Sequence, residues 1–159
     1  MHTLFWIYQE NSASLDMRGE TVSTILVVDD EPLVLNMVAM MLEEDGHSVL
    51  TAGSGAEAID LWRSRRGAID LLVSDVRMPV MDGCTLANGL QQENPNLPVL
   101  LISGYCEHEP MGCNGQFPLL PKPFSMPSLL LAVHTLLEQP RRSATAYDEV
   151  RLISSGAGR

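Results

Sequence analysis

Residues 24–30 read TILVVDD, an unbroken apolar run rich in β-branched side chains that ends in two acids. Such a run is typical of a strand buried on both faces of a parallel sheet, because a half-exposed strand would alternate apolar and polar residues. Apolar residues then recur at helical spacing over 33–42, after Pro32 in the first turn and before Gly46. The stretch therefore predicts a buried strand that passes directly into a helix.

The same alternation of strand and helix continues to residue 139. Further strands are predicted at 47–52, 69–75, 97–103 and 117–120, and further helices at 54–67, 82–94 and 125–139. This order favours a doubly wound α/β fold, with a parallel sheet and helices on both of its faces. Between residues 103 and 117, Pro110, Gly112 and Gly115 leave room for at most a short or degenerate fourth helix.

Composition limits the classes of function. The chain has 159 residues, 45% of them hydrophobic, which is enough for one domain with a proper core. Its net charge of −10 repels phosphate backbones and anionic lipid, so nucleic acid and membrane are poor partners. No apolar run in the sequence reaches the length of a membrane span. We therefore expect a cytoplasmic protein that acts through other proteins.

Both ends of the chain differ from its middle. Residues 1–23 lack the features of a signal peptide and predict a disordered extension, within which Met17 offers an alternative start. Residues 140–159 are rich in Ser, Ala, Gly and Arg with little periodicity, which predicts a disordered tail. The folded domain is expected over 24–139.

The cysteines give a weak signal. Cys84, Cys106 and Cys113 are an odd number without paired spacing, which argues against a secreted disulfide framework and favours a reducing compartment. Cys106, His108 and Cys113 offer only three soft ligands, whereas closed structural zinc sites use four. We do not expect a zinc site in this segment.

Polar side chains stand at the ends of the predicted strands. Asp29 and Asp30 follow the first strand, Asp75 the third, Ser103 the fourth, and Lys122, the only lysine of the chain, the fifth. In an open parallel sheet these ends meet at one edge, where ligands bind. Three carboxylates gathered there repel one another unless a hard divalent cation such as Mg²⁺ lies among them. A carboxylate beside that cation is a plausible nucleophile toward a phosphoryl group.

The sequence resembles the receiver domain of two-component response regulators. The likeness rests on ILVVDDEP (25–32), LLVSDVRMPVMDG (71–83), LLISGY (100–105) and LPKPF (120–124), and it covers about residues 24–139. It implies a flavodoxin-like fold with five parallel strands in the order 2-1-3-4-5. It also implies a bacterial phosphorylation switch rather than an enzyme with a substrate of its own.

The resemblance assigns roles to the acidic residues. Asp75 would be the phosphoacceptor, and Asp29 and Asp30 would hold Mg²⁺, together with Asp75 and the backbone carbonyl of Arg77. A histidine kinase or a histidine phosphotransfer protein would donate the phosphoryl group. LISGY and LPKPF are similar to receivers attached to hybrid kinases, which suggests a stand-alone or phosphorelay receiver.

The resemblance also covers Ser103 and Lys122, which would contact the phosphoryl oxygens, and it makes the Lys122–Pro123 bond a candidate cis peptide. Lysine suits this place because its ammonium is a compact charge on a flexible stem, whereas arginine is a wide planar fork. The chain departs from the family at Leu119, where many receivers carry an aromatic ring that moves on activation. The bulky Arg77 lies where it can tune the lifetime of the phosphorylated state.

Two other functions compete with this interpretation. A nucleotide hydrolase would need a glycine-rich loop ending in lysine and serine or threonine, but the single lysine follows a proline. A receiver without phosphorylation, acting only as an interaction module, is kept open by Leu119. No DNA-binding or nucleotide-binding motif follows residue 139, so output is expected through a downstream protein partner that the sequence does not identify.

Other conspicuous residues have simpler interpretations. Asp82 and Gly83 predict a turn and a helix start. Trp62 and the methionines Met37, Met40 and Met41 are interpreted as core packing. His134 in the last helix resembles a phosphorelay histidine, but a lone helical histidine is more often a surface or packing residue.

Overall fold

The computed structural model describes residues 14–15, 21–65, 68–104, 113 and 115–139. Its main element is a sheet of five strands in the order β4-β3-β5-β6-β7, and every neighbouring pair is parallel. The strands are β3 (Thr24–Val28), β4 (Ser48–Ala52), β5 (Leu71–Asp75), β6 (Val99–Ser103) and β7 (Leu119–Pro121). If only these five strands are counted, from first to last along the chain, their order across the sheet is 2-1-3-4-5, as predicted.

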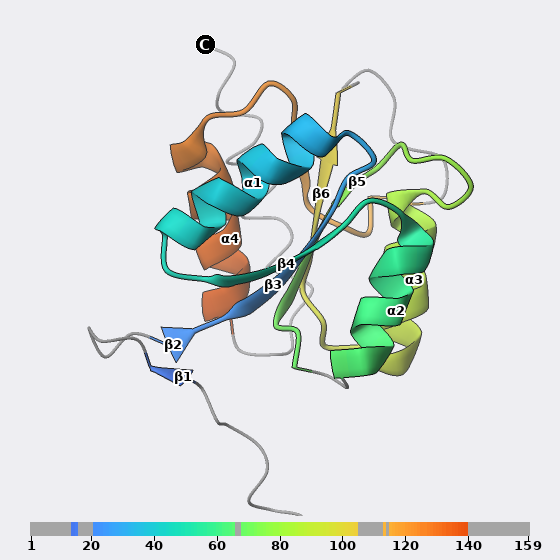
Figure 1. Cartoon of the computed structure of the whole chain (residues 1–159), viewed down its shortest axis with the longest axis horizontal. Helices are drawn as coiled ribbons and strands as arrows, with labels where there is room; N and C mark the ends of the chain where they lie inside the picture. The colour runs from blue at the N-terminus through green and yellow to red at the C-terminus, as the bar shows by residue number, and fades with distance from the viewer. Residues whose placement is uncertain (1–13, 16–20, 66–67, 105–112, 114, 140–159) are drawn as a thin grey trace, which may run out of the picture.

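Helices cover both faces of the sheet, as predicted. They are α1 (Pro32–Glu44), α2 (Gly55–Arg65), α3 (Gly83–Glu93) and α4 (Met126–Glu138). Helices α1 and α4 lie on one side of the sheet, and α2 and α3 on the other (Figure 1). None of the helices in the described part of the chain is long and apolar enough to cross a membrane.

The packing of strand β3 explains why residues 25–28 are all apolar. Ile25 and Val27 belong to the core under α1 and α4, whereas Leu26 and Val28 belong to the core under α2 and α3. All four side chains are at most 2% exposed. From Ile25 to Val28 both faces of the strand are buried in apolar cores, and Asp29 is the first polar residue after them.

Local signals set the helix ends. Ser54 Oγ accepts a hydrogen bond from the N–H of Glu57, and Asp82 Oδ1 accepts one from the N–H of Thr85, so each caps a helix at its start. Gly46, with φ of 94°, ends the turn after α1 in a conformation that favours glycine. These sites agree with the predicted helix boundaries.

Some expectations need correction or lie outside the described residues. Met41 packs against the core, but Met37 and Met40 are 40% and 61% exposed and do not fill it. Trp62 is buried as expected, and its indole N–H donates to Glu93. The expected degenerate helix falls mainly on undescribed residues within 104–116, as does the tail at 140–159. Within 1–23 the structure describes a short antiparallel pair, β1 (Ser14–Leu15) and β2 (Thr21–Val22).

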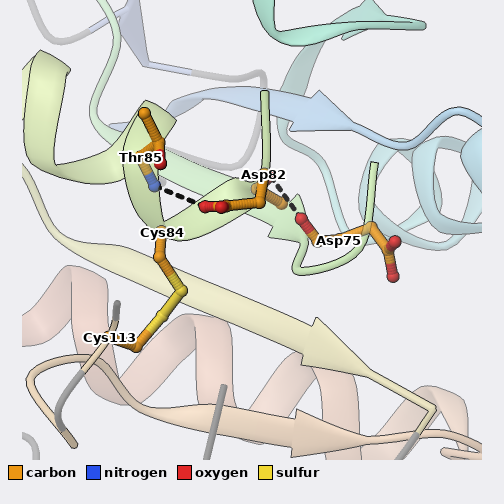
Figure 2. Close-up of a disulfide and its surroundings, with 6 residues drawn as sticks. Asp75, Asp82, Cys84, Thr85 and Cys113 are labelled. Carbon is orange, nitrogen blue, oxygen red and sulfur yellow. Dashed lines mark hydrogen bonds between the residues drawn. A yellow bond between two sulfur atoms is a disulfide. The ribbon is translucent and has the colours of Figure 1, made fainter. Parts of the chain in front are cut away.

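A disulfide joins Cys84 to Cys113, which the cysteine spacing did not predict. The two Cα atoms are 5.3 Å apart, and both residues are buried at 1% and 3% exposure. The bond links the first turn of α3 to the segment between β6 and β7 (Figure 2). Cys113 is therefore unavailable to the weak zinc pattern, whose other members, Cys106 and His108, lie outside the described residues.

The start of α3 also lies against the end of β5. The N–H of Gly83 donates to the carbonyl of Val76 at 2.9 Å, and a Cβ at Gly83 would stand 2.1 Å from the backbone oxygen of Asp75. No side chain fits that space without moving one of the two backbones. Glycine is therefore required here by close approach of the backbone.

Reduction of the disulfide should lower stability. A cross-link over 29 residues restricts the unfolded chain, and its loss is expected to cost about 3 kcal/mol. Thermal unfolding with and without a thiol reductant tests this in wild type and in Cys84→Ala, which should be insensitive to the reductant. Cys106→Ser is the matched control and should behave as wild type. An unchanged midpoint for reduced wild type would contradict the assignment.

Two alanine substitutions in α3 should act in opposite directions. Gly83→Ala is expected to destabilise by about 1–3 kcal/mol, because the new methyl group collides with the Asp75 backbone. Gly89→Ala has nothing within 4 Å of its Cβ, and should stabilise by about 0.5–1 kcal/mol through helix propensity. Urea unfolding measures both, and a shift of the two variants in the same direction would refute the steric explanation.

Candidate functional site

Three carboxylates meet at the carboxyl edge of the sheet. Asp29 and Asp30 follow β3, Asp75 ends the neighbouring β5, and one oxygen from each lies within 4.8 Å of the others. Asp29 and Asp75 are 4% and 7% exposed, whereas Asp30 is open to solvent. The sequence prediction that these acids converge is thus correct in geometry.

Lys122 brings the only ammonium of a side chain to this cluster. Its Nζ lies 2.9 Å from Asp75 Oδ1 and 3.5 Å from Asp29 Oδ2. The residue follows β7, and its N–H donates to the carbonyl of Ser103 at 2.7 Å. The Lys122–Pro123 peptide is cis, as the resemblance implied. Strands β3, β5, β6 and β7 therefore all contribute to the site through the residues at their ends.

Backbone and side-chain hydrogen bonds hold the acids in place. Asp29 Oδ1 accepts from the N–H of Glu31 at 2.8 Å, which leaves Oδ2 facing Lys122. The hydroxyl of Ser74 donates to the carbonyl oxygen of Asp75 at 2.9 Å. The carboxylate of Asp75 points away from the disulfide (Figure 2). This carboxylate contacts Lys122 Nζ, whereas Ser74 holds the Asp75 backbone.

The charges of the cluster do not balance. Burial raises the pKa of Asp75 above its ordinary value, and the charges of Asp29 and Asp30 raise it further, against the opposing effect of Lys122. Burial lowers the pKa of Lys122, but its hydrogen bond and charge interaction with Asp75 outweigh this and raise the pKa overall. One ammonium thus only partly compensates three carboxylates.

Ser103, Arg77 and Leu119 take positions that the sequence order predicted. Ser103 ends β6 beside β5 and is 4% exposed. Arg77 is exposed and stands two residues after Asp75. Leu119 is half-buried and packs with Phe117 in the core under α2 and α3. Tyr105 lies outside the described residues.

The cluster suits a hard divalent cation. All three ligand groups are carboxylates, which match the oxygen preference of Mg²⁺, and the exposed Asp30 leaves a route for water ligands. A cation would offset the repulsion that raises the pKa of Asp75. The buried carboxylate of Asp75 also lies beside the ammonium of Lys122. A carboxylate in this position can attack a phosphoryl group, and the ammonium can neutralise part of the phosphoryl charge.

Two groupings were missed in the sequence. The Cys84–Cys113 disulfide lies beside the site, and a second cluster joins His134 to Asp45 and His47. Cys84 and Cys113 are 29 residues apart, and His134 is 89 residues from Asp45, so no short motif indicates either grouping, although Asp45 and His47 are close in sequence. Only the pairing of strands and helices in space brings them together.

Comparison with known proteins agrees with this geometry. The family model described as response regulator receiver domain matches residues 25–134. The chain is 37% identical over 127 residues to the sensor kinase CckA of Brucella abortus, covering 78% of this chain and 13% of the kinase. It is 40% identical over 128 residues to the probable transcriptional regulatory protein TcrX of Mycobacterium tuberculosis, covering 79% of this chain and 53% of TcrX. The chain thus spans about half of the length of TcrX and a smaller share of the kinase.

Solved structures give the same result. The receiver domain of the hybrid histidine kinase CckA superposes with a TM-score of 0.63 at 38% identity, covering 73% of this chain and all of that one. The receiver domain of NtrX from Brucella abortus superposes with a TM-score of 0.66 at 31% identity, covering 73% of this chain and 99% of that one. Fold, site geometry and sequence match therefore agree: this chain belongs to the response regulator receiver family of two-component systems.

Proposed function

We propose that the protein is a phosphorylation switch in which Asp75 accepts a phosphoryl group from a phosphohistidine. The supporting observation is the pairing of the Asp75 carboxylate with Lys122, 2.9 Å away, inside a cluster of two further acids. A carboxylate oxygen of Asp75 attacks phosphorus as the bond from phosphorus to the donor nitrogen breaks. The histidine leaves with the bonding electrons and takes up a proton.

Each neighbouring residue has a task in this transfer. Lys122 already contacts Asp75, and its ammonium would bind an oxygen of the incoming phosphoryl group. The Ser103 hydroxyl, at the end of the adjacent strand β6, would donate to another phosphoryl oxygen. Both positions approach the acceptor from the β6 and β7 side. A change at Asp75 would thus be transmitted first to Ser103 and Lys122.

Mg²⁺ is the proposed cofactor. Carboxylate oxygens of Asp29, Asp30 and Asp75 and the backbone carbonyl of Arg77 would hold it. When bound, the cation neutralises negative charge on the phosphoryl group and on its acceptor. The buried Asp29 is held by the Glu31 N–H in a fixed orientation, and the exposed Asp30 can adjust.

The proposed partners are a histidine kinase or a histidine phosphotransfer protein upstream, and an unidentified protein downstream. We propose a cytoplasmic location, and no binding of nucleic acid or membrane, in keeping with the net charge of −10. In a reducing cytoplasm disulfides are uncommon, so Cys84 and Cys113 would then pair only under oxidising conditions. Apart from its own phosphorylation and dephosphorylation, the protein is not proposed to be an enzyme.

A non-phosphorylated interaction module is the second candidate. The observation that favours it is Leu119, which packs in the core where an aromatic switch residue would stand in many receivers. The complete set of Asp29, Asp75 and Lys122 favours the phosphorylated switch, because these charges are costly to bury without a use.

Phosphorylation can be tested with a small donor. Incubation with Mg²⁺ and acetyl phosphate should add one phosphoryl group, stable in acid and labile in alkali, as seen by mass spectrometry. Asp75→Asn should abolish the adduct, whereas Asp82→Asn, which affects only a helix cap, should retain it. Absence of the adduct in wild type, under conditions that label a known receiver, would favour the interaction module.

Stability should depend on pH through Asp75. Because its pKa is raised by folding, its ionisation destabilises the metal-free protein as the pH rises through the folded pKa. In the presence of a chelator, Asp75→Asn should therefore have the higher melting temperature at pH 7. This advantage should shrink as the pH falls towards the ordinary aspartate value of about 3.9.

Saturating Mg²⁺ should reverse that order at pH 7, because wild type keeps three carboxylates for the cation and the variant only two. Asp60→Asn, a substitution on the exposed side of α2, serves as the control for removal of one negative charge. An Asp75→Asn variant that melts below wild type in chelator at pH 7 would contradict the electrostatic argument.

A further inference from the structure

A second cluster of potential metal ligands lies at the opposite end of the sheet from Asp75. Asp45 and His47 stand between the end of α1 and the start of β4, and His134 lies in the second half of α4. One ligand atom from each of the three lies within 4.8 Å of the others. The residues come from two separate elements, so the fold and not the local sequence assembles them.

The backbone holds two of these ligands rigidly. The N–H of Gly46 donates to the carbonyl of Glu43, and the N–H of His47 donates to the carbonyl of Leu42. These two bonds, together with the positive φ of Gly46, form a Schellman motif at the end of α1. The backbones of Asp45 and His47 are therefore held in one hydrogen-bonded turn.

His47 is buried without satisfying its ring nitrogens. Its side chain is only 10% exposed, and neither Nδ1 nor Nε2 has a hydrogen-bond partner of acceptable geometry. Nε2 nevertheless lies 3.1 Å from Asp45 Oδ2, so it faces the cluster. An imidazole whose ring nitrogens are buried without hydrogen-bond partners is a costly feature in a core but a good metal ligand.

The same carboxylate oxygen serves both histidines. Asp45 Oδ2 contacts the Nε2 of His134 as well as that of His47, and the two rings stand edge to face with centroids 6.0 Å apart. A simple network of hydrogen bonds explains the contact with His134. It does not explain why His47 turns an unsatisfied nitrogen toward the same point.

The local charge also favours a cation. Helix α1 ends in Glu43 and Glu44, Asp45 is its C-cap, and its last turn has no basic residue. The C-terminus of a helix carries partial negative charge, so acids there are unfavourable unless a cation offsets them. Sequence and helix dipole thus place negative potential at the point where the two imidazoles converge.

We propose that Asp45, His47 and His134 bind Zn²⁺, a borderline divalent transition metal. Two imidazole nitrogens and one carboxylate oxygen form a three-ligand set of the type that zinc accepts with water in the fourth position. The nitrogen donors disfavour Mg²⁺, which the aspartate cluster suits instead. Bound zinc would fasten α4 to the end of α1 and so stabilise this side of the fold.

Zinc titration of the full-length protein tests the proposal. The disulfide is kept oxidised, Cys106 is alkylated, and excess Mg²⁺ occupies the aspartate cluster. One equivalent of Zn²⁺ should bind by calorimetry and shift the ring resonances of two of the four histidines. At a free zinc concentration of about a hundred times Kd, the melting temperature should rise on the order of 10 °C.

The critical variant is His134→Gln, because this side chain is 46% exposed and its replacement leaves the core intact. It should weaken zinc binding at least about tenfold and remove the thermal shift, while His2→Gln and His108→Gln behave as wild type. Equal zinc affinity in wild type and His134→Gln would overturn the proposal, as would absence of binding at micromolar zinc. Acetyl phosphate labelling of Asp75 should survive in His134→Gln, which separates this site from the phosphorylation switch.

Discussion

The ion pair between Lys122 and Asp75 is the constraint on which the site depends. One ammonium lies against two buried carboxylates and near a third, so the cluster keeps an excess of negative charge. Burial and the neighbouring acids raise the pKa of Asp75 even with this partner present. Such a site favours the binding of a positive charge. The unbalanced charge is thus the property of this edge of the sheet on which the proposed switch would depend.

The rest of the fold keeps that cluster from relaxing. The sheet fixes Asp29 and Asp75 on adjacent strands, and the close approach of Gly83 to the Asp75 backbone leaves no space for the turn to shift. The disulfide from Cys84 adds a covalent link from the same helix to the segment between β6 and β7. Because Ser103 and Lys122 flank that segment, the oxidation state of the two cysteines constrains the chain between the two residues that we propose to contact the phosphoryl group.

The sequence predicted those features that depend on order along the chain. Strand β3 was evident because both of its faces are buried, and the site followed because parallel strands end at one edge. The exposure of Met37 and Met40 was missed because helical spacing does not show how wide the buried stripe is. The disulfide and the Asp45 cluster depend on how distant elements pack, and no local spacing encodes that. The roles of phosphoacceptor and Mg²⁺ ligand in the aspartate cluster are still inferred from the family resemblance and from the chemical preferences of carboxylates.

The single lysine has a practical consequence. Besides the α-amino group, Lys122 is the only amine of the chain, and its side chain is 23% exposed. An amine-directed acylating reagent would therefore have a single side-chain target, at the centre of the site, besides the α-amino group. Because the pairing with Asp75 keeps the ammonium protonated, its reactivity would vary with the charge on that partner. The composition of this chain thus provides a built-in chemical reporter for the charge state of Asp75.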